Sequence, residues 1–244
     1  MSSLAALAPS YAAPITVAAR LPPLMLWAWE RPEDLRALGP DVGVAFLAQT
    51  VKLDGDRIHI RPRMQRLRVD DTTVLVAVTR IEGSALVSPP ALLTDALAEA
   101  ITRTASAPHV AGIQIDFDAT ASQRALYRAV VERVRARLAP DVVLSITALA
   151  SWCADDAWLA GLPIDEAVPM LFRMGPFNEP YAMIAQSQRR RAGQAPSRRE
   201  CGAAIGVSLD EPRAVEPSRR RVYVFNPRPW TARTVADARR EAQR

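Results

Sequence analysis

Short apolar runs alternate with segments of helical periodicity along most of the chain. Apolar residues at every third or fourth position are typical of helices that pack one face on a core. Helices are predicted over 32–38, 90–104, 122–138, near 156–159, near 178–191 and from 231 onward. Strands are predicted over 24–29, 42–47, 74–81, 110–117, 142–150, 166–172, 202–208 and 221–225.

The second strand runs on into VKLDGDRIHIR, where Asp54-Gly55 predicts a hairpin turn. Eight strands, mostly followed by helices, predict a single-domain α/β fold, a (β/α)₈ TIM-type barrel over residues 24–244. An open doubly wound sheet is the alternative. Against it, the phosphate-loop patterns GxGxxG and GxxxxGK[ST] are absent from the sequence.

The stretch GIQIDFDA, residues 112–119, places polar residues at every second position. Gln114, Asp116 and Asp118 therefore share one face of the fourth strand, opposite the isoleucines. Strands of an open parallel sheet tend to be apolar throughout, so this alternation favours a barrel with a polar interior. In such barrels the chemistry lies at the rim where the strands end.

Polar and aromatic residues gather where other predicted strands end, and this indicates a site at that rim. Asp116 and Asp118 would raise each other's pKa, so that Asp118 could act as a general acid, with Glu82 as a second carboxylate. The alternative is that these acids pair with nearby arginines and only stabilise the fold. Candidate substrate-binding residues are Trp29, Arg80, Gln114, Trp152, Arg173, Asp210, Asn226 and Trp230.

Four stretches carry a resemblance to a known family: WAWERPEDLR (27–36), GIQIDFDA (112–119), LSITALASWC (144–153) and DEAVPMLFRMG (165–175). The chain resembles a bacterial family of uncharacterised proteins with a glycoside-hydrolase-like barrel, which implies a fold but no activity. GIQIDFDA is also distantly similar to the DxxDxDxE motif of chitinase-type glycoside hydrolases, whose last Glu is the general acid. Here Gln114 replaces an Asp of that motif, and Asp118 replaces the acid.

Composition makes several classes of function less probable for this chain. The net charge is +5, but the basic residues are almost all arginines spread over helix faces, so nucleic-acid binding is not expected. No apolar run reaches the ~20 residues that a membrane span needs. The two histidines are isolated, so neither a metal site nor another cofactor is expected. Residues 1–23 are either a flexible tail or the remnant of an export signal. The protein is extracytoplasmic in the second case and cytoplasmic in the first.

The two cysteines are predicted to lie at opposite ends of the barrel, after the fifth strand and before the seventh. A disulfide needs Cα atoms within about 7 Å, so a bond between Cys153 and Cys201 would contradict the barrel. Three functions stay open. They are a carbohydrate-active enzyme of glycoside-hydrolase type, a non-catalytic glycan-binding barrel, and a scaffold that binds a partner through arginine-rich helices. The first two imply a carbohydrate ligand.

Overall fold

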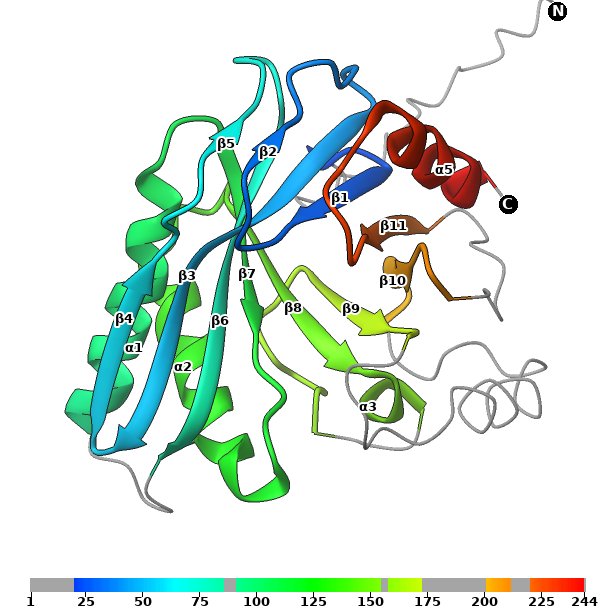
Figure 1. Ribbon diagram of the computed structural model, residues 1–244. Helices are drawn as coiled ribbons and strands as arrows, with labels where there is room; N and C mark the ends of the chain where they lie inside the picture. The colour runs from blue at the N-terminus through cyan, green and yellow to red at the C-terminus, as the bar shows by residue number, and fades with distance from the viewer. Residues whose placement is uncertain (1–19, 86–90, 155–157, 173–200, 212–219, 244) are drawn as a thin grey trace, which may run out of the picture.

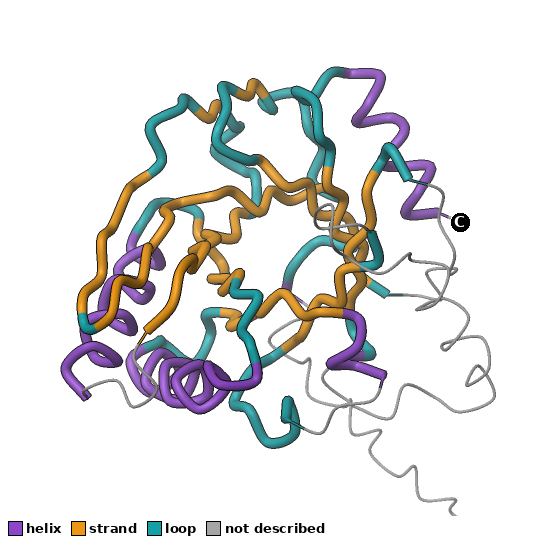
Figure 2. The backbone as a smooth tube through the Cα atoms, turned by 60° about the horizontal axis from the view of Figure 1, so that its bottom comes forward, coloured by secondary structure: helices purple, strands orange, loops and turns teal. Residues whose placement is uncertain are grey.

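The structure is a computed structural model that describes residues 20–85, 91–154, 158–172, 201–211 and 220–243. Within these residues, eight parallel strands form a barrel: β1 Leu24–Ala28, β3 Val42–Gly55, β6 Leu75–Ala85, β7 Val110–Asp116, β8 Val143–Leu149, β9 Glu166–Met170, β10 Ala204–Ser208 and β11 Arg221–Phe225. The barrel closes because β1 pairs in parallel with both β3 and β11. Figure 2 shows this ring of strands from the end at which they finish, here called the mouth. The predicted (β/α)₈ fold is confirmed.

One side of the mouth is raised by long strands. β3 has 14 residues and β6 has 11, whereas β7 and β8 have 7 each. The far half of β3 also pairs antiparallel with β4, Arg57–Pro62, so the predicted hairpin is confirmed. Gly55 turns the chain with a φ of +62°, a conformation that glycine adopts without steric cost. In Figure 1 these three strands reach beyond their neighbours at the lower left.

Helices cover the outside of the barrel. α1 Ala91–Arg103 and α2 Arg124–Arg137 follow β6 and β7, and they pack on each other and on the outward side chains of β7. Leu97 and Ile101 of α1, and Val130 and Val134 of α2, are buried at helical spacing. This apolar stripe is the one that the sequence shows. α5 Ala232–Gln243 follows β11 and contacts β1 and β11.

The helix predicted over residues 32–38 is wrong. Residues 32–38 hold the two-residue strand β2, Glu33–Asp34, which pairs in parallel with β5, Leu67–Arg68. The backbone N–H groups of Glu33 and Leu35 donate to carbonyls near β5, so they are not available for a helix. A helix of seven residues is also too short to be stable alone. The short helix expected near 156–159 lies partly outside the described residues, and its residues 158 and 159 belong to a turn; a different short helix, α3 Ala150–Ala154, directly follows β8. The helix expected near 178–191 lies outside the described residues.

The end of the barrel opposite the mouth contains a buried cluster of polar groups. Glu166 and Arg221, the first residues of β9 and β11, form an ion pair with side-chain exposures of 0% and 8%. Tyr223 donates its hydroxyl to Glu166 at 2.6 Å. Arg221 also donates to the carbonyls of Leu21 and Pro22 at 3.1 and 2.9 Å, which holds the chain segment before β1 against this end. This end is therefore closed by charge pairing rather than open to a ligand.

The expectation about the cysteines is wrong, because Cys153 and Cys201 form a disulfide with their Cα atoms 5.9 Å apart. The barrel is nevertheless intact. Cys153 lies in α3, which follows the end of β8, and Cys201 lies three residues before β10. Both cysteines belong to the same outer apolar cluster. A residue that precedes a strand and one that follows a strand can therefore meet on the outside of the barrel, although the strand ends themselves lie at opposite ends of it.

Loss of this disulfide is expected to lower the free energy of unfolding. It links residues 48 positions apart, and a closed loop of that length restricts the unfolded chain by roughly 4 kcal/mol in the chain-entropy model. We expect a Cys153→Ser, Cys201→Ser double variant to lose about 2–5 kcal/mol in urea unfolding. The same loss should appear when the wild type is reduced, and reduction should not affect the double variant. Equal stability of the oxidised and reduced wild type would contradict this expectation.

Candidate functional site

Three polar residues of the fourth barrel strand and its extension lie at successive heights in the barrel. Gln114, the deepest, is fully buried. Its oxygen accepts from Trp27 Nε1 at 3.0 Å, and its nitrogen donates to Ser145 Oγ at 3.0 Å. Both ends of the amide are therefore engaged within the interior. Gln114 lies outside the cavity linings described below, so the structure places it beneath the site as a support for Trp27.

Asp116 is held from two sides. Thr147 of β8 donates to Oδ1 at 2.8 Å, and Arg80 of β6 donates to Oδ2 at 3.2 Å. Burial raises the pKa of the Asp116 carboxyl, while the charge of Arg80 and the hydrogen bond from Thr147 oppose that shift. Thr147 and Arg80 come from the strands on either side of β7, so the barrel itself fixes this carboxyl group.

Asp118 lies two residues beyond β7, at the rim, where solvent reaches it. No group in the described part of the chain donates a hydrogen bond to its carboxylate. Desolvation by the surrounding protein and the negative charge of Asp116 raise the pKa of Asp118 to about 6, against the opposing charge of Arg80. A carboxyl group with this pKa is protonated in about half of the molecules at pH 6 and in about a tenth of them at pH 7. It can therefore donate a proton to a bound molecule.

A cavity of about 250 Å³ opens at the mouth above Asp116. Its wall is largely aromatic. Phe172 and Phe225 stack with ring centroids 5.6 Å apart, and Trp29 meets Phe225 edge to face at 6.3 Å. The lining residues are Trp27, Trp29, Val78, Arg80, Asp116, Asp118, Thr147, Met170, Phe172 and Phe225. We call this space the aromatic cavity.

A second space of about 410 Å³ lies beside the first, toward the extended end of β6. Arg80 and Asp118 line both spaces, so they stand on the boundary between them. Two contacts hold Arg80 in this position. Its Nε donates a hydrogen bond to Glu82 at 2.8 Å, and its guanidinium carbon lies 5.4 Å from the centre of the Trp29 ring. The lining residues are Arg80, Ile81, Glu82, Gly83, Phe117, Asp118, Thr120, Ser122 and Gln123. We call this space the polar cavity.

Trp29, Arg80, Glu82, Asp116 and Asp118 are thus brought together at the mouth, as their positions at strand ends suggest. Several residues that the sequence does not single out for the site join them. Trp27 and Thr147 point into the barrel like Gln114, and strand alternation is the signal that identifies them, because Trp27 lies two residues before Trp29 and Thr147 two residues after Ser145. Phe172 and Phe225 carry no such signal, because apolar strand ends look the same inside and outside a barrel.

Other expected site residues lie elsewhere. Trp152 is buried on the outside of the barrel, 4.8 Å centre to centre from Trp158, so its expected place at the mouth is wrong. Asp210 is exposed, and Asn226 is buried in the turn after β11, where it accepts from the N–H of Arg228 at 3.1 Å. Neither lines the aromatic cavity or the polar cavity. Arg173 lies outside the described residues.

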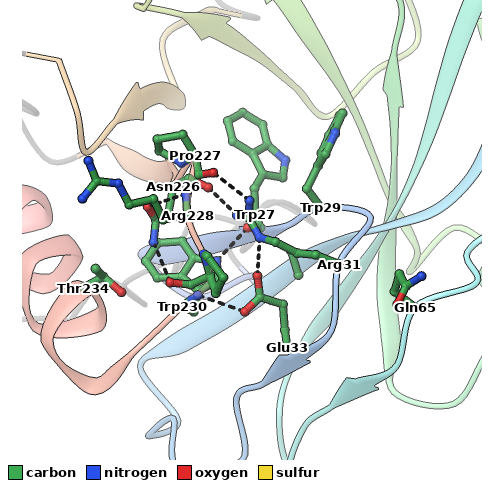
Figure 3. A network of polar contacts seen from close by, with 12 residues as sticks. Trp27, Trp29, Arg31, Glu33, Gln65, Asn226, Pro227, Arg228, Trp230 and Thr234 are labelled. Carbon is green, nitrogen blue, oxygen red and sulfur yellow. Dashed lines mark hydrogen bonds and ion pairs between the residues drawn. The ribbon is translucent and has the colours of Figure 1, made fainter.

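Trp230 is also buried, and it belongs to a network that supports the site (Figure 3). Its indole N–H donates to the carbonyl of Trp27 at 2.8 Å, and its backbone N–H donates to Glu33 at 2.9 Å. Glu33 also accepts from Arg31 at 2.7 Å, and Arg31 in turn binds backbone carbonyls in the turn after β11. Trp230 therefore anchors the segment that carries Trp29 rather than binding a ligand itself.

Arg63, just after β4, fixes the same segment from the other side. Its guanidinium donates to the carbonyls of Ala28, Trp29 and Arg31 at 3.1, 2.6 and 2.6 Å. The WAWERPEDLR stretch is thus a clamped turn that presents Trp29 at the mouth. The polar residues of this stretch hold the turn in its conformation.

Residues 71–171 match a family model described as a domain of unknown function, DUF3142. The matched stretch runs from β6 to β9 and includes Arg80, Asp116 and Asp118. No curated protein matches the sequence. The resemblance to an uncharacterised family with a glycoside-hydrolase-like barrel is confirmed by this match together with the fold.

Solved structures show the same fold at low sequence identity. A family GH18 chitinase from Chromobacterium violaceum is 12% identical with a TM-score of 0.52, over 90% of this chain and 80% of that chain. The SleL spore cortex-lytic enzymes of Bacillus megaterium QM B1551 and Bacillus cereus are 13% and 16% identical, each with a TM-score of 0.51 over 76% of this chain. The chain spans about half the length of these two enzymes, 50% and 51%. The chain therefore shares the (β/α)₈ barrel fold of these enzymes.

The structure adds one observation about membranes. No helix among the described residues is long and apolar enough to cross a bilayer.

Proposed function

We propose that the mouth of the barrel binds a carbohydrate chain and that Asp118 is the general acid that protonates a glycosidic oxygen. The observation that carries this proposal is the placement of Asp118. It is a carboxyl group with a pKa raised to about 6, it accepts no hydrogen bond from the described residues, and it lines both cavities. Glycoside hydrolysis requires a proton donor that is still protonated near neutral pH.

The aromatic cavity suits one face of a sugar ring. A pyranose presents C–H groups on its faces and hydroxyls around its edge, so it packs on aromatic planes while its edge seeks polar partners. Trp27 and Trp29 supply such surfaces, and Thr147 and Asp118 supply polar atoms within the same cavity. The relatives in this fold include a chitinase and spore cortex-lytic enzymes, which supports a carbohydrate as the ligand.

Asp116 acts as a positioning residue in this proposal. Both of its oxygens are occupied, so it is not free to attack the sugar. Its negative charge raises the pKa of Asp118 and thereby keeps the acid protonated. Glu82 is the candidate for the second carboxylate. One of its oxygens accepts from Arg80, and the other is available to orient a water in the polar cavity.

The test of this proposal is a panel of glycans that includes chitin oligomers, peptidoglycan strands and other bacterial polysaccharides. We expect the wild type to release reducing ends from at least one of them. A second candidate, a glycan-binding barrel without catalysis, is favoured by the shorter side chain of Asp118 and by the fully engaged Asp116. Binding without release would select that candidate, and absence of both binding and release across the panel would refute a carbohydrate function.

Trp29→Ala is expected to weaken glycan binding about tenfold. The substitution removes a partly exposed indole from the wall of the aromatic cavity, and loss of one such packing surface costs on the order of 1–1.5 kcal/mol. The affinity is measured by titration calorimetry with the glycan that the panel identifies. Phe at this position should restore most of it. Unchanged affinity of the alanine variant would show that the ring does not contact the ligand.

A further inference from the structure

The raised side of the mouth presents one face of three neighbouring strands, β4, β3 and β6 (Figure 1), beside the polar cavity. Paired residues of neighbouring strands point to the same face. Lys52 of β3 is paired with Glu82 of β6 on one side and with His59 of β4 on the other. Glu82 lines the polar cavity, so Lys52 and His59 continue the same surface away from it. Arg57 and Arg61 share this face with His59 by strand alternation. We call the surface formed by Lys52, Arg57, His59 and Arg61 the basic wall.

The opposite face of these strands is buried. Val51, Leu53 and Ile81 belong to an apolar cluster to which the outer helices α1 and α2 contribute. Gln49, on the same face, donates to the carbonyl of Ala100 in α1 at 2.9 Å. The sheet is thus held from behind, whereas all four side chains of the basic wall are exposed. The wall is therefore a preformed surface that a ligand can reach from the side of the mouth.

Two cations of the basic wall have no counter-charge. Arg57 lies 4.0 Å from the carboxylate of Asp56 and opposite Asp54 in the hairpin. By contrast, no acid among the described residues forms an ion pair with Lys52 or Arg61. These two are diagonal neighbours across β3 and β4, with Cα atoms about 7–8 Å apart. Like charges at this separation repel each other, and an anion that binds between them removes the repulsion.

The alternative is that these charges only protect an exposed strand edge. β4 is the outer strand of the sheet, and charged side chains on such a strand prevent it from pairing with another chain. This role explains Arg57 and Arg61. It does not explain Lys52, which lies on β3 between β4 and β6, where no edge is exposed. The cations of two strands instead form one surface, which favours a binding role.

The form of the basic wall favours a carboxylated polysaccharide over a nucleic acid. Its four residues include no Trp, Tyr or Phe on which bases could stack. Duplex DNA carries one charge per ~1.7 Å of its axis, a far denser array than two cations separated by about 7–8 Å. A polysaccharide with one carboxylate on each sugar presents separate charges, and the guanidinium of an arginine binds a carboxylate through two parallel hydrogen bonds.

From this arrangement we propose that the basic wall binds the carboxylate groups of an acidic polysaccharide that extends from the mouth across β3 and β4. Lys52 and Arg61 bind two of its carboxylates. This inference rests on the proposed function for the polysaccharide backbone, and it adds that the polymer is acidic. The wall recognises the charge of the polymer at a distance from Asp118, and it takes no part in the chemical step.

The test uses two polymers with one backbone. Polygalacturonate carries a carboxylate on each sugar, and its fully methyl-esterified form has the same chain without the charge. Binding of the wild type to each immobilised polymer is measured by biolayer interferometry between about 50 and 200 mM salt. We expect the ester to bind at least about tenfold more weakly than the acid at the lower salt concentration, and we expect only the binding of the acid to weaken as salt is added.

A double variant, Lys52→Gln with Arg61→Gln, assigns the binding to the basic wall. We expect its affinity for polygalacturonate to fall about threefold to tenfold at low salt, as two exposed charge contacts are lost, and its affinity for the ester to stay unchanged. Both side chains are exposed, so the melting temperature should change little.

The matched control removes the same charge elsewhere. Arg20→Gln with Arg233→Gln changes two exposed arginines, one before β1 at the end opposite the mouth and one in α5, which lies across the barrel from β4 (Figure 1). This control should keep the wild-type affinity. Equal binding of the acid and the ester, or equal losses in the two double variants, would overturn the basic wall as a binding surface. Duplex DNA that binds at least as tightly as polygalacturonate would overturn the polysaccharide as its ligand.

The outcomes also separate this inference from the proposed function. Lys52 and Arg61 line neither cavity, so their loss leaves the general acid in place. Release of reducing ends from a glycan, with no difference between the acid and the ester in binding, would overturn the basic wall and leave the proposed function standing. Charge-dependent binding of polygalacturonate that the wall variant weakens, without release from any glycan, would refute the general acid and support the wall.

Discussion

Asp118→Asn is expected to reduce turnover of the accepted glycan by about 10²–10⁴-fold, the usual contribution of a positioned general acid. Asparagine has nearly the same shape and cannot donate a proton of comparable acidity. The loss should lie in kcat, with little change in affinity. Asp141→Asn is the matched control, because Asp141 is exposed just before β8, at the end of the barrel opposite the mouth. Full activity of the Asp118 variant would remove this residue from the mechanism.

The pH profile gives an independent view of the same residue. The acid must be protonated, so kcat/KM should fall as the pH rises above about 6, the pKa of Asp118. The charge of Asp116 helps to raise that pKa, so Asp116→Asn should move this falling limb to lower pH. A falling limb that stays in place in the Asp116 variant would assign the proton donor to another group.

The titration of Asp118 should also affect stability. The pKa of Asp118 is raised from 3.8 to about 6 on folding, so the contribution of this group is fully present below pH 3.8 and is lost as the pH rises through about 6. Asparagine does not titrate. The melting temperature of Asp118→Asn, relative to wild type, should therefore rise between pH 4 and pH 7. The effect should be modest, because Asp118 is exposed and solvent screens its charge.

Strand alternation accounts for the part of the site that could be predicted from the sequence. Arg80 and Asp116 lie on barrel strands, where each position points inward or outward by parity, and both lie at the mouth as expected. Asp118 continues the parity of β7 for two residues beyond its end. These residues come from neighbouring strands, so their proximity follows from the barrel fold alone.

Strand alternation does not predict the direction of side chains that lie outside the strands. Trp152 belongs to α3, and Trp230 lies five residues after β11, so neither has its direction set by the sheet. Both are buried in outer apolar clusters. The disulfide escaped prediction for the same reason, because Cys153 and Cys201 lie off the strands. Contacts outside the barrel depend on helix packing that a single sequence does not specify.

The second large effect concerns the opposite end of the barrel. Glu166→Gln is expected to lower the free energy of unfolding by about 3–5 kcal/mol, the usual cost of removing one partner of a buried ion pair. The amide keeps the shape of the carboxylate but removes the negative charge that Glu166 places beside the guanidinium of Arg221 in a site that is almost fully buried. In a chain of this size such a loss corresponds to a fall of roughly 6–20 °C in melting temperature.

Two further variants separate charge from hydrogen bonding at this end. Tyr223→Phe removes only the hydroxyl that donates to Glu166, so it should cost about 1–2 kcal/mol. Glu99→Gln breaks the exposed pair with Arg103 in α1 and should cost no more than about 0.5 kcal/mol. If Glu166→Gln proves as mild as Glu99→Gln, the buried pair does not stabilise the barrel. If Glu166→Gln does not fold, the cost seen in Tyr223→Phe still measures the cluster, since a loss near zero there would contradict its role.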